Sequence, residues 1–153
     1  MVFDMKFVAD AMLGRLAKWL RILGYDTAYF PQVEDRDLVR IARSEGRLLL
    51  TRDRELTRRR GLRSLLIESD RLDEQVGQLL RDLDLSVDWS VSRCARCNTV
   101  LRSIGKEEVR SRVPPYVLRK HQEFSLCARC DKVYWKGTHW QSMQRRIEKI
   151  RGG

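Results

Sequence analysis

Acidic residues stand just past the end of each segment that is predicted as a β-strand in the first half of the chain. Four of them follow the segments 6–9, 27–30 and 48–51: Asp10, Asp35, Asp37 and Asp53. If these strands run parallel, their carboxylates gather along one edge of the sheet, where open α/β sheets bind ligands. Carboxylate oxygens suit a hard divalent cation such as Mg²⁺ or Mn²⁺. An acidic edge on a chain that is basic elsewhere is typical of a metal-dependent nuclease.

The same acids also have a purely structural interpretation as helix caps. Asp10, Asp35 and Asp53 each stand where a predicted helix begins, and Asp is a favoured N-cap residue. Because Ser, Thr and Asn cap about as well, three aspartates in succession favour a second, shared role. Asp37 lies inside its helix, where it is either a ligand or a solvated acid of the first turn.

Two C-x-x-C pairs form the second group of residues that could do chemistry. Cys94 and Cys97 make the first pair and Cys127 and Cys130 the second, with 29 residues between the pairs. This spacing favours a closed, tetrahedral Zn²⁺ site of four thiolates. Two disulfides or an iron–sulfur cluster are the alternatives, and disulfides fit poorly with a cytoplasmic protein. A closed site has no open coordination position, so its expected role is to fold a module too small for its own core.

Alternating strand and helix patterns position the acids. Apolar residues at helical spacing predict four helices, one after each predicted strand: 11–23, 36–45, 54–60 and 72–83. The fourth predicted strand covers residues 64–67. This βαβαβαβα order predicts an α/β fold, a parallel sheet flanked by helices.

The pattern changes near Trp89. Residues 94–143 contain all four cysteines and no long helical period, and a short helix is expected over 140–150. We place a domain boundary at about 88–93. The prediction is an α/β domain followed by a small zinc ribbon: residues 1–90 and residues 91–153.

The net charge of the 153-residue chain, +10, is unevenly distributed. Residues 1–90 hold 16 Lys or Arg and 16 Asp or Glu, whereas residues 91–153 hold 15 and 5. The basic surface is therefore expected in the C-terminal part, and nucleic acid is the first candidate partner. The alternative is that the charge serves solubility alone.

Composition and hydropathy favour a globular protein of the cytoplasm. Hydrophobic residues make up 42% of the chain and charged residues 34%. No apolar run approaches the ~20 residues of a membrane helix, and the N-terminus shows no signal-peptide core. We therefore expect no membrane partner.

Long contiguous blocks of the chain resemble a known family. Residues 7–27, FVADAMLGRLAKWLRILGYDT, closely resemble the opening of the PIN-like family named after the C-terminal RNase domain of the mut-seven exonuclease. Residues 46–56, GRLLLTRDREL, match its second block, and the cysteine pairs with residues 134–140, YWKGTHW, resemble its zinc ribbon. The resemblance implies a PIN-like fold, an acidic site for a divalent metal, and RNA hydrolysis.

The resemblance also singles out particular acids. Asp10 and Asp53 carry over residue by residue. Asp35 fits the family's spacing for the middle acid slightly better than Asp37. The fourth acid of typical PIN nucleases has no clear counterpart in this chain.

Basic and aromatic residues near these motifs are candidates for contact with RNA. Arg52 adjoins Asp53 and could bind the scissile phosphate, and Arg15 lies on the first predicted helix. Trp135 stands among lysines, as suits base stacking on single-stranded RNA, although a small ribbon could instead use it as core. His139 either contacts substrate or caps a turn. The run 58–60, three arginines, is a phosphate-tracking patch or a solvated helix face.

These observations lead to three functional hypotheses. The first is a ribonuclease that uses Mg²⁺ or Mn²⁺ at the acids and Zn²⁺ at the cysteines, with the ribbon helping to hold RNA. The second is a non-catalytic RNA-binding or ribosome-associated module on the same fold. The third, a metal-dependent phosphatase for small substrates, is disfavoured by the basic ribbon.

Overall fold

The computed structural model describes residues 4–152 of the chain. The chain divides into two compact units, Met1–Asn98 and Thr99–Gly153, each with its own sheet. The first unit extends past the predicted boundary because hydrogen bonds made by Arg21 and Arg93 tie its last residues to the rest of that unit. The division into functional domains after residue 90 stays a prediction.

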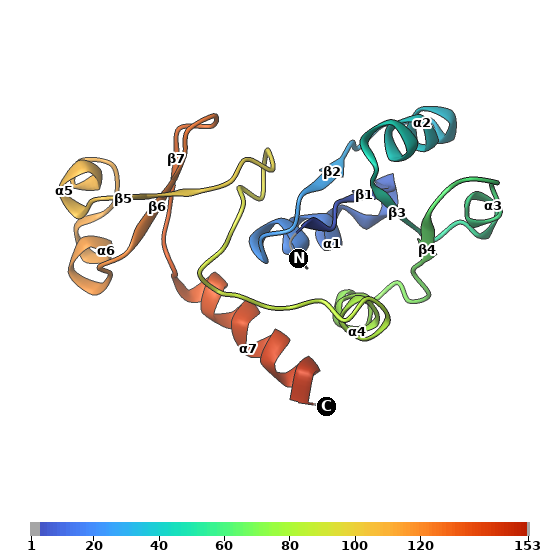
Figure 1. Cartoon of the computed structure of the whole chain (residues 1–153). Coiled ribbons are helices and arrows are strands. Elements are labelled where there is room, and N and C mark those ends of the chain that lie inside the picture. The colour runs from blue at the N-terminus through green and yellow to red at the C-terminus, as the bar shows by residue number, and fades with distance from the viewer. Residues whose placement is uncertain (1–3, 153) are drawn as a thin grey trace. The chain divides into compact units, whose positions relative to one another are not determined.

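The first unit is built on a four-stranded sheet in which all neighbouring strands are parallel (Figure 1). In spatial order the strands are β2 Thr27–Tyr29, β1 Phe7–Ala9, β3 Leu48–Thr51 and β4 Ser64–Leu66. Every residue of β1 and β3 is buried, as their continuous apolar sequences predict. The parallel α/β sheet predicted from the sequence is confirmed, and β1 lies between β2 and β3.

Four helices alternate with these strands: α1 Gly14–Ile22, α2 Asp35–Glu45, α3 Arg54–Thr57 and α4 Leu72–Asp82. Gly24 follows the end of α1 with φ +97°, a left-handed conformation that favours glycine. The helix predicted over 11–23 begins differently, as a 3₁₀ turn at Ala11–Leu13. There the carboxylate of Asp10 accepts a hydrogen bond from the backbone N–H of Met12.

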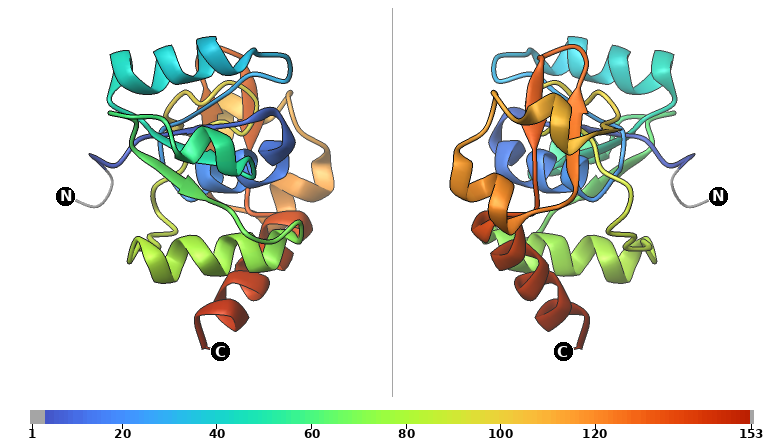
Figure 2. Two further views of the ribbon diagram at one scale, coloured as in Figure 1. Left: turned by 90° about the vertical axis from the view of Figure 1, so that its right-hand side faces the viewer. Right: turned by 90° about the vertical axis from the view of Figure 1, so that its left-hand side faces the viewer.

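Helices cover both faces of the sheet, with α2 on one side and α4 on the other (Figure 2). The core on the α2 side joins the sheet to α2 and α3: Val8, Leu38, Val39, Ala42, Leu49 and Leu56. Side chains alternate along a strand, so Phe7 points to the opposite face from Val8. On that face the rings of Phe7 and Tyr25 pack edge to face with centroids 5.9 Å apart.

The second unit holds a three-stranded antiparallel sheet of order β5-β6-β7. Its strands are β5 Arg102–Ile104, β6 Phe124–Cys127 and β7 Lys132–Tyr134. Its helices are α5 Lys106–Val109, α6 Pro115–Lys120 and α7 Thr138–Gly152. The small core of this unit is apolar: Val109, Val113, Val117, Leu118 and Phe124.

The insertion between β5 and β6 accounts for the long spacing between the two cysteine pairs. Its helices α5 and α6 have four and six residues, too few to display a helical period in the sequence. The helix predicted over 140–150 is present and longer than expected, as α7. No helix within residues 4–152 is both long enough and apolar enough to cross a bilayer.

Candidate functional site

Asp10 stands at the end of the central strand β1, at the carboxyl edge of the parallel sheet. Its backbone N–H donates to the carbonyl of Leu50 at 3.0 Å. Its side chain is almost buried, with the residue 8% exposed, and Oδ1 accepts from the Met12 N–H at 2.9 Å. Oδ2 accepts from the Thr51 hydroxyl at 2.6 Å and from the Arg52 N–H at 3.1 Å. Three donors therefore hold this carboxylate in one orientation and link β1 to β3.

Asp53 lies two residues past the end of the buried strand β3 and is exposed. Its backbone N–H donates to the Thr51 hydroxyl at 3.0 Å, and its Oδ1 accepts from the Glu55 N–H at 2.9 Å. Thr51 thus donates to Asp10 and accepts from Asp53, so one buried hydroxyl connects the two acids. Sequence reasoning missed Thr51. The feature that could have indicated Thr51 is its position at the end of an apolar strand, directly before Arg52 and Asp53.

The middle acids are arranged differently from the predicted caps. Glu34, rather than Asp35, occupies the N-cap position of α2, and its side chain makes no capping hydrogen bond. Asp35 is the first helical residue and is exposed, so the capping interpretation holds for Asp10 and Asp53 but is wrong for Asp35. Asp37 accepts a hydrogen bond from Arg40 at 3.3 Å.

The topology places all of these acids after three neighbouring parallel strands, β2, β1 and β3. Among residues 4–152, however, only the cysteines bring three or more potential metal ligands within 4.8 Å of one another. Carboxylates remain suitable ligands for a hard cation, since Asp35 is exposed and Oδ2 of Asp53 accepts no hydrogen bond from the described part of the chain. A cation shared by these acids stays a prediction.

The predicted phosphate contacts near this edge have contrasting surroundings. The guanidinium of Arg52 donates to the carbonyl of Ile67, past the end of β4, at 3.3 Å. Arg15 is exposed in the first turn of α1. Arg52 therefore braces the sheet edge in this structure, while Arg15 has its side chain at the surface. A contact of either residue with RNA stays a prediction.

The four cysteines form a compact cluster. Their sulfur atoms all lie within 4.8 Å of one another, and none of the four is joined in a disulfide. Cys94 and Cys127 are buried, whereas Cys97 and Cys130 are half-buried. The Cys130 N–H donates to the sulfur of Cys127 at 3.3 Å. Four thiolates at this spacing are a donor set suited to Zn²⁺, and the disulfide alternative is not realised.

A buried arginine supports the first cysteine pair from within the first unit. Arg21 donates through Nε to the Thr27 carbonyl at 2.8 Å and through Nη1 to the carbonyl of Ala95, between the two cysteines, at 2.9 Å. Burial lowers the pKa of Arg21 from its ordinary value, and the negative charges of Cys94 and Cys97 oppose that shift. Sequence reasoning placed Arg21 only on the core-facing helix, because no local pattern reveals a contact 74 residues away.

Asn98, directly after this cysteine pair, makes a second set of contacts. Its Oδ1 accepts from the Thr27 N–H at 3.0 Å, and its Nδ2 donates to Asp26 at 2.6 Å. Asp26 also accepts from Arg47 at 2.8 Å. Burial opposes ionisation of Asp26, but the hydrogen bonds from Arg47 and Asn98 outweigh it and lower the pKa of this carboxyl. The edge strand β2 is thereby fastened to the first cysteine pair.

The predicted RNA-binding residues of the second unit lie in and beside β7 and α7. Trp135 is half-buried and packs against the small core, which supports its interpretation as a core residue. His139 is exposed in the first turn of α7. The ammonium of Lys136 lies 4.9 Å from the ring centroid of Trp140, a cation–π contact. Contact of Trp135 or His139 with RNA stays a prediction.

Comparison with known proteins identifies a family. The model of the Mut7-C RNAse domain matches residues 5–147, a range that contains all four acids and both cysteine pairs. No curated protein and no solved structure matches the chain.

Proposed function

Because the chain belongs to the Mut7-C RNAse domain family, we propose that it hydrolyses RNA phosphodiester bonds at the carboxyl edge of its parallel sheet with a divalent cation. The observation that carries this proposal is the pairing of Asp10 and Asp53 through the Thr51 hydroxyl, at the ends of adjacent strands. Helix capping does not require the Thr51 hydroxyl to donate to the Asp10 carboxylate while it accepts from the backbone N–H of Asp53. These contacts relate the carboxylate of Asp10 to the backbone from which Asp53 projects.

Each acid has a distinct role in this proposal. Asp10, held by three donors, is the fixed ligand of the cation. Asp53 is the second ligand, with Oδ2 as the free oxygen, and Asp35 or Asp37 supplies the third carboxylate from the start of α2. When bound, Mg²⁺ or Mn²⁺ would stabilise charge on the phosphoryl oxygens and increase the acidity of water. The Thr51 hydroxyl, which donates to the Asp10 carboxylate and accepts from the Asp53 backbone N–H, keeps these two acids in register.

The four cysteines are proposed to hold one structural Zn²⁺. A closed set of four thiolates leaves no coordination position for substrate, so we assign this site no part in the chemistry. Its role is to hold together the short strands and small core of the second unit. In this proposal Trp135 and His139 of that unit, with Arg15 and Arg52 of the first, contact single-stranded RNA.

The experiment compares wild type with Asp10→Asn on RNA and DNA of the same sequence, in Mn²⁺, Mg²⁺ or EDTA, with mapping of the cleaved ends. Asp73→Asn, an equal charge change in the first turn of α4, is the control. We expect RNA cleavage that EDTA abolishes, that Asp10→Asn loses and that the control keeps. Cleavage by Asp10→Asn at the wild-type rate would refute the assignment.

A second candidate function is a non-catalytic RNA-binding module on the same fold. Two observations favour it. Within residues 4–152 the acids do not converge to the 4.8 Å that the cysteines achieve, and Asp10 and Asp53 both cap helices. RNA binding without cleavage under all three metal conditions would support this function over the ribonuclease.

A further inference from the structure

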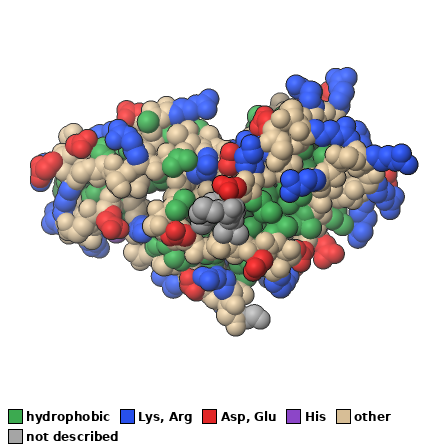
Figure 3. Space-filling model, in the orientation of Figure 1, with side chains coloured by type: hydrophobic (Ala, Val, Ile, Leu, Met, Phe, Trp, Pro, Cys, Tyr) green, Lys and Arg blue, Asp and Glu red, His purple; other side chains and the backbone are tan. Residues whose placement is uncertain are grey.

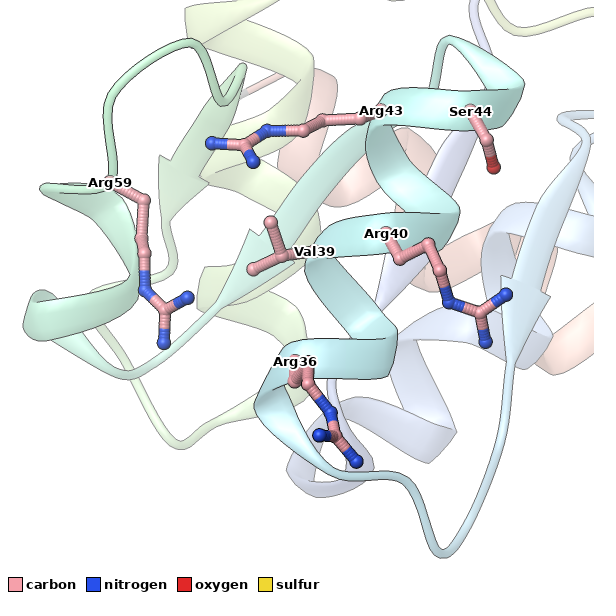
Figure 4. A pocket seen from close by; sticks show the side chains of 6 residues that line it. All are labelled: Arg36, Val39, Arg40, Arg43, Ser44 and Arg59. Atoms are coloured by element: carbon pink, nitrogen blue, oxygen red, sulfur yellow. The ribbon is translucent and has the colours of Figure 1, made fainter.

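A hollow lined by arginines lies along α2, where Arg59 from the segment after α3 joins residues of the helix. Its volume is about 460 Å³, and its lining contains four arginines, one apolar residue and one hydroxyl, with no acid: Arg36, Val39, Arg40, Arg43, Ser44 and Arg59 (Figure 4). Figure 4 shows Arg43 and Arg59 extending on the α3 side of α2, near Val39, while Arg40 extends on the other side of the helix.

This concentration of charge is local. Residues 1–90 hold equal numbers of basic and acidic side chains, so a random distribution would mix acids into any hollow of this size. The space-filling view shows Lys and Arg side chains gathered over the region of α2 and α3 (Figure 3). General solubility explains the hollow poorly, because the unit that carries it, residues 1–98, holds 18 Lys or Arg against 16 Asp or Glu.

Two of the four arginines, Arg36 and Arg59, are ready to bind phosphate, whereas Arg40 donates to Asp37 at 3.3 Å. Arg36 lies 3.6 Å from Glu34 in a highly exposed ion pair, and such pairs contribute only about 0–1 kcal/mol. The side chain of Arg59 is exposed and makes no hydrogen bond or ion pair within the described residues. Arg43 is different, since its guanidinium donates to the carbonyl of Arg60 and so connects α2 to the loop after α3. That contact sets one wall of the hollow.

The hollow is continuous in the chain with the acidic edge. Helix α2 begins at Asp35 and carries three of the arginines along its length, and α3 begins directly after Asp53 and leads to Arg59. From Asp35 to Arg43 the helix rises about 12 Å, which spans more than one phosphate of a nucleic acid strand. Both segments that line the hollow therefore start at candidate catalytic acids.

We infer that this arginine hollow binds the phosphate backbone of RNA next to the segment that reaches the acidic edge. The inference rests on the proposed function in that RNA is the ligand, but it does not require cleavage. Guanidinium groups recognise phosphate oxygens through paired N–H donors, and the residues that line the hollow include no acid. The sequence-based expectation that the basic surface is mainly C-terminal is thereby extended to the first unit.

The test measures affinity of the full chain for fluorescent single-stranded RNA of about 20 nucleotides, in EDTA so that no cleavage occurs. The variant is Arg36→Ala/Arg59→Ala, and the matched control is Arg71→Ala/Arg81→Ala on α4, which removes the same charge from exposed positions. We expect Arg36→Ala/Arg59→Ala to bind RNA about 10-fold more weakly than wild type. The slope of log K against log salt concentration should be about 1.4 less steep, because two phosphate contacts are lost. The control should bind like wild type.

Equal affinity and salt dependence in wild type and Arg36→Ala/Arg59→Ala would overturn the inference, as would an absence of RNA binding by wild type. A polyglutamate peptide that binds wild type as tightly as RNA, and that the variant no longer binds, would assign the hollow to an acidic protein partner instead. Because binding is measured without a divalent cation, the affinity of the hollow for RNA can still be interpreted if the ribonuclease proposal fails. If wild type cleaves RNA in Mn²⁺ and the affinity of the variant is unchanged, the hollow is rejected as an RNA site and the ribonuclease proposal stands.

Discussion

The cysteine cluster and the acidic edge are both sets of potential metal ligands, yet their geometry differs. The four sulfurs lie within 4.8 Å of one another, whereas the acids do not form such a group within residues 4–152. Each C-x-x-C pair forms within one tight turn, so only two turns must meet. The acids instead follow three strands, and their spacing depends on the whole sheet.

The difference matches the two roles that we propose, a structural metal at the cysteines and a reactive one at the acids. The thiolate cluster is complete from protein groups alone, which suits a metal that holds the fold together. At the acidic edge, Asp10 is fixed by protein donors while Asp35 and Asp53 are exposed. An edge that keeps ligand positions open can accept a cation together with a substrate phosphate.

The largest effect is expected from a substitution in the cysteine cluster. Cys127→Ser should remove zinc and unfold the second unit, because the binding free energy of a structural Zn²⁺ is about 10 kcal/mol or more. Zinc content by mass spectrometry and the fluorescence of Trp135 and Trp140 report both events. Arg129→Ser, in the same turn, should keep one zinc per chain. A fully folded, zinc-loaded Cys127→Ser protein would contradict the closed site.

A smaller effect is expected on the acidic side from Thr51→Val. The substitution leaves a buried oxygen of Asp10 without one donor and the Asp53 N–H without its acceptor, at a cost of about 1–3 kcal/mol in the free energy of unfolding. RNA cleavage should fall roughly 10-fold as the acids lose their fixed relation, by the usual size of positioning effects. Thr51→Ser, which keeps the hydroxyl, should restore both quantities. Equal cleavage by the Val and Ser variants would show that the hydroxyl does not position the acids.

The smallest effect sharpens the link between the first cysteine pair and β2. The folded state lowers the pKa of Asp26, so this carboxylate stabilises the fold above its unfolded pKa of about 3.9, and the contribution disappears as pH falls through the lower folded value. Asp26→Asn should therefore reduce the free energy of unfolding by about 1 kcal/mol at pH 7 and by less near pH 3. Urea denaturation at the two pH values measures this difference. An equal loss at both would assign the effect to packing.

The sequence predicted the first unit well because its signals are local. The apolar run at Leu48–Leu50 and the helical period of residues 11–23 correspond to β3 and to the segment of α1. The C-x-x-C spacing likewise predicted the cysteine cluster, since the chemistry and the geometry lie in the same four-residue turn. The short helices α5 and α6 escaped prediction because each contains fewer than two turns.

What the sequence did not predict depends on contacts between distant residues. The Thr51 hydroxyl reaches Asp10 across 41 positions, and Arg21 reaches Ala95 across 74. The arginine hollow was missed for a related reason. The arginines of α2 at positions 36, 40 and 43 form a helical row, but Arg59 joins them only when α3 folds back beside α2.

The most direct measurement of the central claim is the rate of RNA cleavage by Asp53→Asn in Mn²⁺, with RNA affinity and zinc content measured on the same preparation. Glu55→Gln, two residues along the same short helix, is the matched control because it removes an equal charge from an exposed position. Asn retains capping ability, so the start of α3 should survive. The account predicts that Asp53→Asn loses cleavage while it keeps its zinc and its RNA affinity, and that Glu55→Gln cleaves like wild type. Cleavage by Asp53→Asn at the rate of Glu55→Gln would contradict it and leave the acid as a helix cap.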